Sequence, residues 1–468
     1  MALSVLTDDQ VKEVLENLTL DELLSFQDAL RSALHDYSNG IQDSEDGHME
    51  QPHRTTIQSS KTGATTLFMP SCSPAGVGIK VITLTPPSDD CLDPDEVKPV
   101  ARPTGAITLF SETGNPVGIL HASTLTAFRT ALASTCLLIR RHHVRTITVF
   151  GCGEQAYWHI RLALMMRGST IRHVNIINRR FSESCKAILK RLYSTPPHIK
   201  AREGWSEAAI SILTPQYNEY PRLQREQVRG ADVIFCCTPS TQALFDASLL
   251  TSREGRKKGR LIVAVGSYTP RMAELPVELL RQATRVHESG HRHYHKHAPE
   301  GGVIVVDTLD GAMKEAGEVI AAGLSPRQLV ELGELVMLHR IAHEEELSDS
   351  NSFSSSNLSI PSSEFEQLDI SSGRSMSSIF ASDAGTSTAA SSRASSPSRK
   401  RPSLAHKRTA SQGSVDTQKA KDDHLARWLQ YGNVIYKSVG LGLMDLTVGM
   451  HLIQFAKEKG VGSHIEGF

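Results

Sequence analysis

The stretch Val149-Phe150-Gly151-Cys152-Gly153-Glu154-Gln155-Ala156 joins a short β-rich run to a segment of helical character that extends to Met166. Gly151 allows a tight turn, Gly153 lets the backbone approach a pyrophosphate, and the small Ala156 permits close packing of helix against strand. The free N–H groups at the start of the helix would donate hydrogen bonds to that pyrophosphate. A plain strand-to-helix turn can also carry glycines, but this position between strand and helix favours a dinucleotide-binding turn.

Strands and helices alternate along the chain after this turn. Apolar, β-rich runs occur at residues 173–177, 208–213, 232–237, 261–265 and 302–306. Such alternation implies right-handed crossovers between parallel strands, with helices covering both faces of the sheet. We therefore predict an α/β fold with a Rossmann-type, doubly wound parallel sheet over residues 131–345.

The region before residue 131 has a different pattern. Its predicted elements are a helix at residues 20–34, strands at 66–69, 78–84, 106–110 and 117–120, and a helix at 124–139. The last two strands flank the turn at residues 112–116, which predicts an antiparallel hairpin. Near the C-terminus, residues 424–459 are predicted to be mostly helical.

A Ser-rich stretch interrupts the folded pattern between about Leu347 and Lys421. It has few large apolar residues, so it cannot bury enough surface to offset the ordering of its backbone. We predict a disordered insertion over residues 346–421. Within it, basic residues precede the hydroxyls of Ser403, Thr409 and Ser411. Phosphorylation there could recruit a phospho-dependent partner, or the segment could be an unmodified linker.

The end of the second predicted strand distinguishes between the two nicotinamide cofactors. An NAD site usually has Asp or Glu there, which binds the ribose 2′-hydroxyl. This chain has Asn178-Arg179-Arg180 instead. A neutral Asn does not repel a 2′-phosphate, and an Arg offers it a forked, charge-assisted grip. The sequence thus favours NADP(H) over NAD(H), although the arginines could also be a solvated helix start.

Three cations stand out because of their surroundings. Lys80 lies inside the apolar run of residues 77–82, where a charge needs a partner. Arg129 lies among small and apolar residues of a predicted helix, and Arg54 precedes the strands of the N-terminal region. Each can be a residue with a buried stem and solvated head, part of a core ion pair, or a substrate-binding group.

The composition excludes several classes of protein. The 50 basic and 51 acidic residues give a net charge of −1, which favours neither nucleic acid nor a membrane surface as a partner. No apolar run approaches the length of a membrane-spanning helix. The seven cysteines are dispersed, as is typical of reduced thiols in a cytoplasmic protein. Five histidines between residues 287 and 297 are predicted to lie in a solvated loop, so no metal site is expected.

Several segments resemble the ornithine cyclodeaminase and mu-crystallin family. They are Phe68-Met69-Pro70, Gly78-Ile79-Lys80-Val81, Leu125-Thr126-Ala127-Phe128-Arg129-Thr130-Ala131, the turn Gly151–Ala156, and Tyr436-Lys437-Ser438-Val439-Gly440. The Arg-Thr-Ala and Lys-Ser-x-Gly pieces are the most distinctive. The resemblance covers most of residues 3–345 and 422–460, but not the insertion.

The resemblance implies that residues 1–130 and 422–468 form an α+β substrate-binding and dimerisation domain, and hence a homodimer. It implies that Arg54, Lys80 and Arg129 hold the carboxylate of a small amino-acid or imino-acid substrate. The implied cofactor-binding residues are Gly151, Gly153, Glu154, Gln155, Ala156, Asn178, Arg179, Arg180, Thr238 and Ser438.

One position departs from the family pattern. Cyclodeaminating members carry an aspartate in a Gly-x-Asp-x-Pro context, whereas this chain has Tyr268 there. A phenol can donate a proton at neutral pH but is a poor base, or it can simply pack beside the cofactor. We therefore predict an NADP(H)-dependent oxidoreductase that reduces an imine (ketimine) or oxidatively deaminates a small amino acid, with Lys80 and Tyr268 as candidate catalytic residues. The alternatives are ornithine cyclodeamination to proline and ammonia, and non-catalytic, NADPH-dependent binding of a small ligand.

Overall fold

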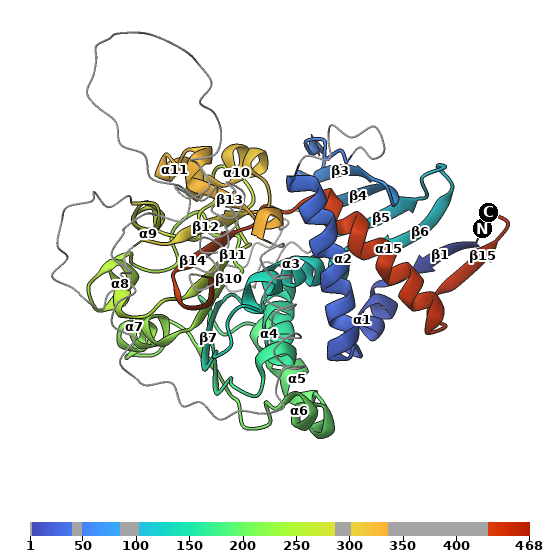
Figure 1. Cartoon of the computed structure of the whole chain (residues 1–468). Coiled ribbons are helices and arrows are strands. Elements are labelled where there is room, and N and C mark those ends of the chain that lie inside the picture. Colours follow the sequence, from blue (N-terminus) through green and yellow to red (C-terminus); the bar gives the residue numbers. More distant parts are fainter. Residues whose placement is uncertain (1, 40–48, 85–102, 286–300, 336–428) are drawn as a thin grey trace, which may run out of the picture.

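The computed structural model describes residues 2–39, 49–84, 103–285, 301–335 and 429–468, which form two β-sheets and their covering helices (Figure 1). The predicted insertion, its hydroxyl sites and the His-rich segment lie outside these described residues. Among the helices of the described ranges, none has the length and apolarity needed to cross a membrane.

The larger sheet has eight parallel strands in the order β13-β12-β14-β11-β10-β7-β8-β9. Its strands are β7 Thr146–Phe150, β8 His173–Ile177, β9 Ala209–Leu213, β10 Val233–Cys236, β11 Leu261–Ala264, β12 Val303–Val306, β13 Leu329–Glu331 and β14 Val434–Lys437. The order reverses at β7, which neighbours both β8 and β10. This confirms the predicted Rossmann-type, doubly wound sheet and places its switch point at the Gly-rich turn.

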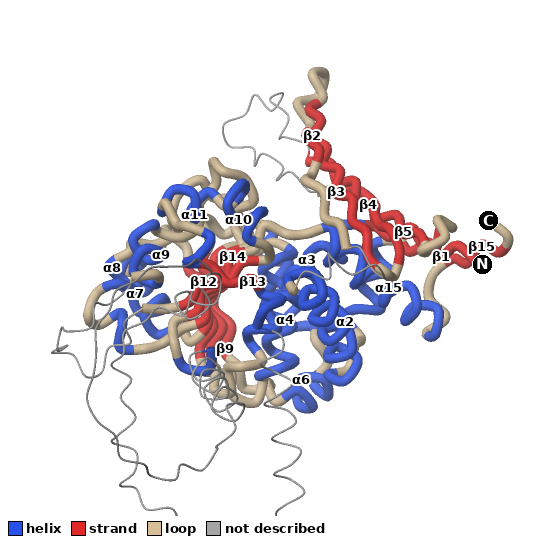
Figure 2. The backbone as a smooth tube through the Cα atoms, turned by 45° about the horizontal axis from the view of Figure 1, so that its top comes forward, coloured by secondary structure: helices blue, strands red, loops and turns tan. Residues whose placement is uncertain are grey.

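Helices cover both faces of this sheet, as its strands of nearly continuous apolar residues require. Figure 2 shows the sheet between α7, α8 and α9 on one side and α3 and α4 on the other. Alternate residues of each strand enter two separate cores, so Val149 packs in one and Phe150 in the other. The helices are α3 Ala122–Leu138, α4 Glu154–Arg167, α5 Glu183–Ser194, α6 Pro197–Glu203, α7 Tyr220–Gly230, α8 Ser248–Thr251, α9 Val277–Ala283, α10 Leu309–Glu315 and α11 Gly317–Ala322.

Strand β14 corrects the prediction for the C-terminal region. The sequence predicted mostly helix over residues 424–459, and α15 (Gly442–Glu458) is helical, but Val434–Lys437 is a strand between β11 and β12. All four of its residues are buried, and periodicity cannot distinguish so short an apolar run from a helix segment. β14 therefore belongs to the larger sheet, although the sequence assigned residues 422–468 to the other domain. The rest of the domain division stays a prediction.

The smaller sheet has seven strands in the order β15-β1-β6-β5-β4-β3-β2. They are β1 Ala2–Leu6, β2 Thr55–Gln58, β3 Thr65–Ser73, β4 Gly76–Leu84, β5 Thr104–Phe110, β6 Pro116–His121 and β15 Ser463–Glu466. The predicted hairpin of β5 and β6 is confirmed as antiparallel. Strands β1 and β15, which the sequence analysis missed, pair with each other and bring the two chain ends together (Figure 1).

Three helices pack with the smaller sheet. Helix α1 spans Asp8–Glu16 and α2 spans Leu20–Ser38, each begun by a capping box on a threonine. The predicted leucine pattern buries Leu23, Leu30 and Leu34 of α2. Helix α15 lies against β3, β4, β5 and α2. The chain thus runs from the centre of the larger sheet, through β14, directly onto the smaller one.

Candidate functional site

The carboxyl ends of the parallel strands meet at one edge of the larger sheet. Residues predicted to contact the cofactor follow β7 (Gly151), β8 (Asn178), β10 (Thr238) and β14 (Ser438). Gly151 and Thr238 are close enough that a Cβ on Gly151 would lie 3.0 Å from the Thr238 methyl group. The structure therefore brings these positions together in the row β8-β7-β10-β11-β14, at the crevice where such sheets bind ligands.

The Gly-rich turn has the geometry that the sequence predicted. Gly151 has φ +103°, which favours glycine, and its N–H donates to the Ile177 carbonyl at 3.0 Å. Gly153 is the N-cap of α4 and supplies no side-chain cap, and a Cβ there would meet nothing within 4 Å. Ala156 is fully buried against the sheet. Uncapped N–H groups facing open space fit a dinucleotide pyrophosphate.

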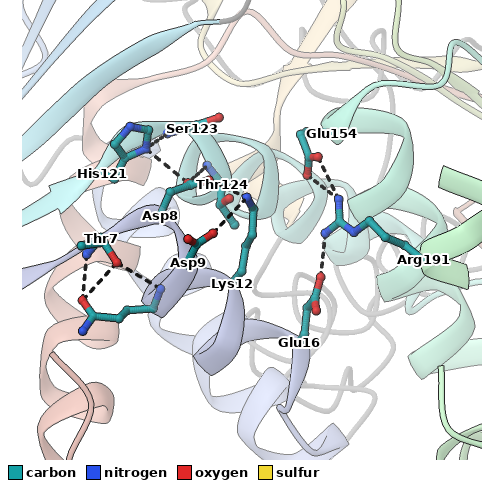
Figure 3. Close-up of polar contacts among 11 residues, drawn as sticks. Thr7, Asp8, Asp9, Lys12, Glu16, His121, Ser123, Thr124, Glu154 and Arg191 are labelled. Carbon is teal, nitrogen blue, oxygen red and sulfur yellow. Dashed lines mark hydrogen bonds and ion pairs between the residues drawn. The ribbon is translucent and has the colours of Figure 1, made fainter. Parts of the chain in front are cut away.

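The side chain of Glu154 is joined to Arg191 of α5, as Figure 3 shows. Its two carboxylate oxygens accept hydrogen bonds from Nη1 of Arg191 at 2.8 Å each, and Nη2 of Arg191 reaches Glu16 of α1 at 2.7 Å. The Arg191 guanidinium also lies 3.4 Å from the ring centre of Tyr157. Because the side chain is occupied by Arg191, only the backbone N–H of Glu154 is left to bind the cofactor, and that role stays a prediction.

The segment after β8 presents its two arginines to solvent. Arg179 and Arg180 are both exposed. Asn178 donates from Nδ2 to the Arg180 carbonyl at 2.8 Å, so its side chain stabilises the turn that carries them. The geometry leaves both guanidinium groups accessible to a phosphate.

Lys80 and Arg129, from different elements, converge on one buried carboxylate that the sequence analysis missed. Nζ of Lys80 lies 2.5 Å from Oδ2 of Asp445, and Nε of Arg129 lies 3.1 Å from Oδ1. The three side chains are only 2%, 4% and 2% exposed for Lys80, Arg129 and Asp445. They come from β4, α3 and α15, so the cluster forms only when the chain has folded.

Arg54 completes the group from the other side of the turn after β14. Its Nη2 donates to the Val439 carbonyl at 3.0 Å and contacts Oε2 of Glu315 at 2.5 Å. Gly440 has φ +83°, and a Cβ there would lie 2.9 Å from Nη2 of Arg129. This turn therefore lies between Arg54 and Arg129, and a larger residue at position 440 would displace the Arg129 guanidinium.

The cluster has an excess of positive charge. Among the described residues, these three cations (Lys80, Arg129 and Arg54) pair with two carboxylates, Asp445 and Glu315, which leaves one net positive charge. Burial lowers the pKa of Lys80 to about 8; Asp445 opposes this shift, and the charges of Arg129 and Arg54 add to it. Such a site favours a small anion, because a ligand carboxylate supplies the missing negative charge.

Tyr268 follows β11 at the same edge. It is half-buried, and burial raises the pKa of its phenol while the charge of Arg54 opposes the shift. The hydroxyl therefore stays protonated at neutral pH, as a hydrogen-bond donor near Arg54.

Asp307, which follows β12, holds the turn at residues 438–440 between the cation cluster and the edge where the carboxyl ends of the parallel strands meet, which we call the cofactor edge. The sequence analysis also missed this residue. Its Oδ2 accepts hydrogen bonds from the Ser438 hydroxyl at 2.7 Å, the Val439 N–H at 3.0 Å and the Gly440 N–H at 2.8 Å. Its Oδ1 accepts from the Tyr436 hydroxyl. Ser438 is thus directed toward Asp307, and the only sequence signal for this role was a carboxylate after an apolar strand.

Glu274 joins the ends of β10 and β11. It is fully buried; Oε1 accepts from the Thr238 N–H at 2.7 Å, and Oε2 accepts from the N–H groups of Gly266 and Ser267 at 2.7 and 3.0 Å. Burial raises its pKa to about 7, against the lowering effect of Lys437. It positions the loops after β10 and β11 at the cofactor edge.

We expect Glu274→Ala to destabilise the protein more than Glu274→Gln. Alanine leaves three backbone donors without an acceptor, at a cost of about 1–3 kcal/mol for each that water does not reach. Glutamine keeps one acceptor oxygen and most of the volume. Urea unfolding of both variants measures the difference, and equal free energies of unfolding for the two variants would contradict this role.

Comparisons with known proteins agree with this architecture. The model of the ornithine cyclodeaminase/mu-crystallin family matches residues 7–209. An uncharacterized protein of Saccharomyces cerevisiae is 28% identical over 71% of this chain and 86% of its own length. A Delta(1)-pyrroline-2-carboxylate reductase of Bacillus cereus is 26% identical over 57% of this chain and 68% of its own. The ketimine reductase mu-crystallin of Mus musculus is 26% identical over 71% and 87%.

Solved structures share the fold at lower identity. Thermococcus litoralis Delta(1)-pyrroline-2-carboxylate reductase, in complex with NADH and L-proline, has a TM-score of 0.57 at 16% identity, covering 99% of each chain. An archaeal alanine dehydrogenase dimer with bound NAD has a TM-score of 0.58 at 18% identity, covering 100% of each chain. The sequence match, the doubly wound sheet and the Gly-rich turn agree: this chain is similar to the ornithine cyclodeaminase/mu-crystallin family, whose model it matches over residues 7–209.

Proposed function

We propose that the protein is an NADP(H)-dependent oxidoreductase that reduces a small 2-imino acid (a ketimine), or in reverse oxidatively deaminates a small amino acid. The observation that carries the proposal is the net positive cluster that the buried Lys80 and Arg129 form with the part-buried Arg54, at the β14 end of the cofactor edge. Two of the relatives are named as reductases of such imines, Delta(1)-pyrroline-2-carboxylate and ketimines. These names support the substrate class.

Different residues along the cofactor edge bind the substrate and donate the proton. When bound, the reduced nicotinamide supplies a hydride. Arg54 and Arg129 hold the substrate carboxylate, which fixes the imine carbon at the strand ends where the nicotinamide ring would lie. Lys80, kept in place by Asp445, donates a proton to the imine nitrogen, and Tyr268 is a second donor.

Arg179 and Arg180 support NADP(H) as the cofactor, with NAD(H) as the alternative. Their guanidinium groups are exposed beside the expected ribose position, and no carboxylate stands at the end of β8 to repel a 2′-phosphate. The solved neighbours are described with NADH or NAD. The choice between the two cofactors therefore rests on these residues of this chain.

We expect Arg179→Ala to weaken NADPH binding about ten- to hundredfold, because it removes a charge-assisted contact worth about 1.5–3 kcal/mol. NADH lacks the 2′-phosphate, so its affinity should hardly change. Titrations of protein fluorescence with each cofactor measure both constants. Arg172→Ala is the matched control, since Arg172 is also exposed but lies at the opposite end of β8. An equal loss for NADPH and NADH would refute the phosphate contact.

The activity itself is tested by NADPH oxidation with cyclic 2-imino acids, with 2-oxo acids plus amines, and with imines that lack a carboxylate. We expect turnover only of the carboxylate-bearing compounds. Proline and ammonia formed from ornithine without net NADPH consumption would instead support cyclodeamination. Tight NADPH binding without turnover of any compound would support the non-catalytic alternative.

We also propose a homodimer formed through the smaller sheet. Its strands leave Ile57, Val77 and Ile119 exposed, at 55%, 41% and 36%. The archaeal alanine dehydrogenase neighbour is described as a dimer. Light scattering of the purified protein measures the assembly, and a monomeric mass at micromolar concentration would contradict it.

A further inference from the structure

Two cysteines meet between the two segments that are proposed to hold the cofactor's phosphates. Cys152 is the middle residue of the Gly-rich turn, and Cys185 lies in the first turn of α5, just after Arg179 and Arg180. Their Sγ atoms are 3.1 Å apart. Cys152 is 8% exposed and Cys185 is fully buried. Family resemblance and the proposed reaction assign neither thiol a role.

The surroundings favour a thiolate on Cys185. Nδ2 of Asn178 lies 3.3 Å from its Sγ, the Ser182 hydroxyl lies 3.6 Å away, and the sulfur sits at the N-terminal end of a helix of 12 residues. The neighbouring Cys152 thiol and these donors lower the pKa of Cys185 below its usual range. The pKa of Cys152 is raised, first by its contact with Cys185 and then by burial. One sulfur is thus poised to attack and its neighbour to resolve the product.

Three of the four other described thiols, Cys136, Cys236 and Cys237, are buried in the core. Burial raises the pKa of Cys136 to about 12 and raises the pKa values of Cys236 and Cys237 well above their usual range. These three stay protonated and unreactive in the core.

We propose that Cys152 and Cys185 are an oxidant-sensitive pair that closes to a disulfide and thereby weakens dinucleotide binding. The first half, the disulfide, stands on the geometry of the two sulfurs. The second half rests on the proposed function, because it needs the cofactor to lie on the Gly-rich turn. A peroxide is the oxidant class.

The reaction balances with one peroxide. The Cys185 thiolate attacks one oxygen of hydrogen peroxide, the O–O bond breaks, and with one proton the products are a sulfenic acid and water. The Cys152 sulfur then attacks the Cys185 sulfur, and the departing hydroxide takes the Cys152 proton to form a second water. The two thiols lose two electrons in all, and the peroxide gains them.

Closing the bond changes the cofactor edge. The sulfurs must move from 3.1 Å to a bond of about 2.05 Å, which ties the Gly-rich turn to the start of α5. The backbone before Cys152 has little room on the β10 side, because a Cβ on Gly151 would lie 2.7 Å from the Cys237 carbonyl oxygen. We expect the disulfide to change the position of the turn's N–H groups relative to the Arg179 segment, so that they bind a pyrophosphate less well.

We expect cofactor binding and formation of the Cys152–Cys185 disulfide to disfavour each other. Because Cys185 is fully buried, a peroxide must enter past the neighbouring Gly153, which is exposed and faces open space. A bound pyrophosphate would cover the same opening. Because coupling between two binding events is reciprocal, a disulfide that weakens NADPH binding is itself disfavoured by NADPH.

The test treats the full-length protein with hydrogen peroxide, blocks the remaining thiols by alkylation, and maps peptides by mass spectrometry without reduction. We expect a cross-linked peptide pair containing Cys152 and Cys185, which dithiothreitol separates. Cys185→Ser should give no such pair, whereas Cys136→Ser should give it as the unchanged protein does. Alkylation of both Cys152 and Cys185 after peroxide treatment, with no cross-link, would overturn the proposal.

The second measurement is the NADPH affinity before and after peroxide. We expect an affinity about tenfold lower after oxidation, restored by dithiothreitol, with no change on oxidation in Cys185→Ser. A cross-link that forms while NADPH affinity stays the same would overturn the regulatory half only. Failure of NADPH to bind even the reduced protein would instead contradict the proposed cofactor, and the cross-link result would stand independently.

Discussion

Asp445→Asn is expected to lower the free energy of unfolding by about 3–5 kcal/mol, the cost of breaking a buried ion pair on one side. Asp445 is the carboxylate shared by Lys80 and Arg129, and all three side chains are nearly inaccessible to solvent. Asparagine keeps the shape but not the charge. Two buried cations then lose their common counter-charge, and Arg54 adds to their repulsion. Urea unfolding monitored by circular dichroism measures the change.

Asp9→Asn is the matched control, because the Asp9 side chain is 97% exposed and lies 3.8 Å from Lys12. Its effect should stay within about 1 kcal/mol, as for exposed pairs in general. Adding Lys80→Met to Asp445→Asn should recover part of the lost stability, because it removes one of the two unpaired cations. A loss for Asp445→Asn no larger than that of the control would contradict the buried cluster.

Local signals made the larger sheet predictable. The Gly-rich turn and the apolar runs around it carry their information within a few residues, since turn geometry and strand burial depend on adjacent positions. Strand β14 carried no such signal. It is four residues long, and it enters the sheet between β11 and β12 only after the chain has passed the Ser-rich insertion.

For the same reason, only some residues of the site could be predicted from the sequence. Lys80 and Arg129 stood out because each is a charge in an apolar segment. Their partner Asp445 is 365 residues from Lys80 in sequence and looks like an ordinary acidic residue of a helix. Glu274 and Asp307 were missed likewise, since their partners include backbone N–H groups in the loops after other strands, which no sequence pattern displays.

The turn at residues 438–440 links the two halves of the proposed site. Asp307 holds it from the end of β12, while Arg54, just before β2, and Arg129 of α3 lie against it. Four residues, 438–441, separate Lys437 at the end of β14 from the start of α15, and Asp445 lies in the first turn of that helix. A shift of β14 would therefore reach both the cofactor edge and the cation cluster.

Lys80→Met is expected to lower kcat/KM for a 2-imino acid about 10²–10⁴-fold, the range for loss of a general acid. Methionine keeps the length and apolar stem of lysine, and Asp445 retains Arg129 as its partner, so the fold should persist. NADPH oxidation measures the rate, while the unfolding curve and the NADPH affinity show that the variant is folded. Lys314→Met, at an exposed lysine near the site, is the control.

The pH profile separates proton donation from mere binding. The pKa of Lys80 is lowered from 10.5 to about 8, so Lys80 is protonated below that pH and loses its proton as the pH rises through it. If Lys80 is the donor, kcat/KM of the unchanged enzyme falls about tenfold per pH unit above pH 8. Lys80→Arg stays charged throughout, because Arg does not deprotonate in proteins, so this fall should disappear. If kcat/KM of Lys80→Arg still falls above pH 8, another group is the one that titrates. Lys80 would then bind the substrate carboxylate without donating the proton.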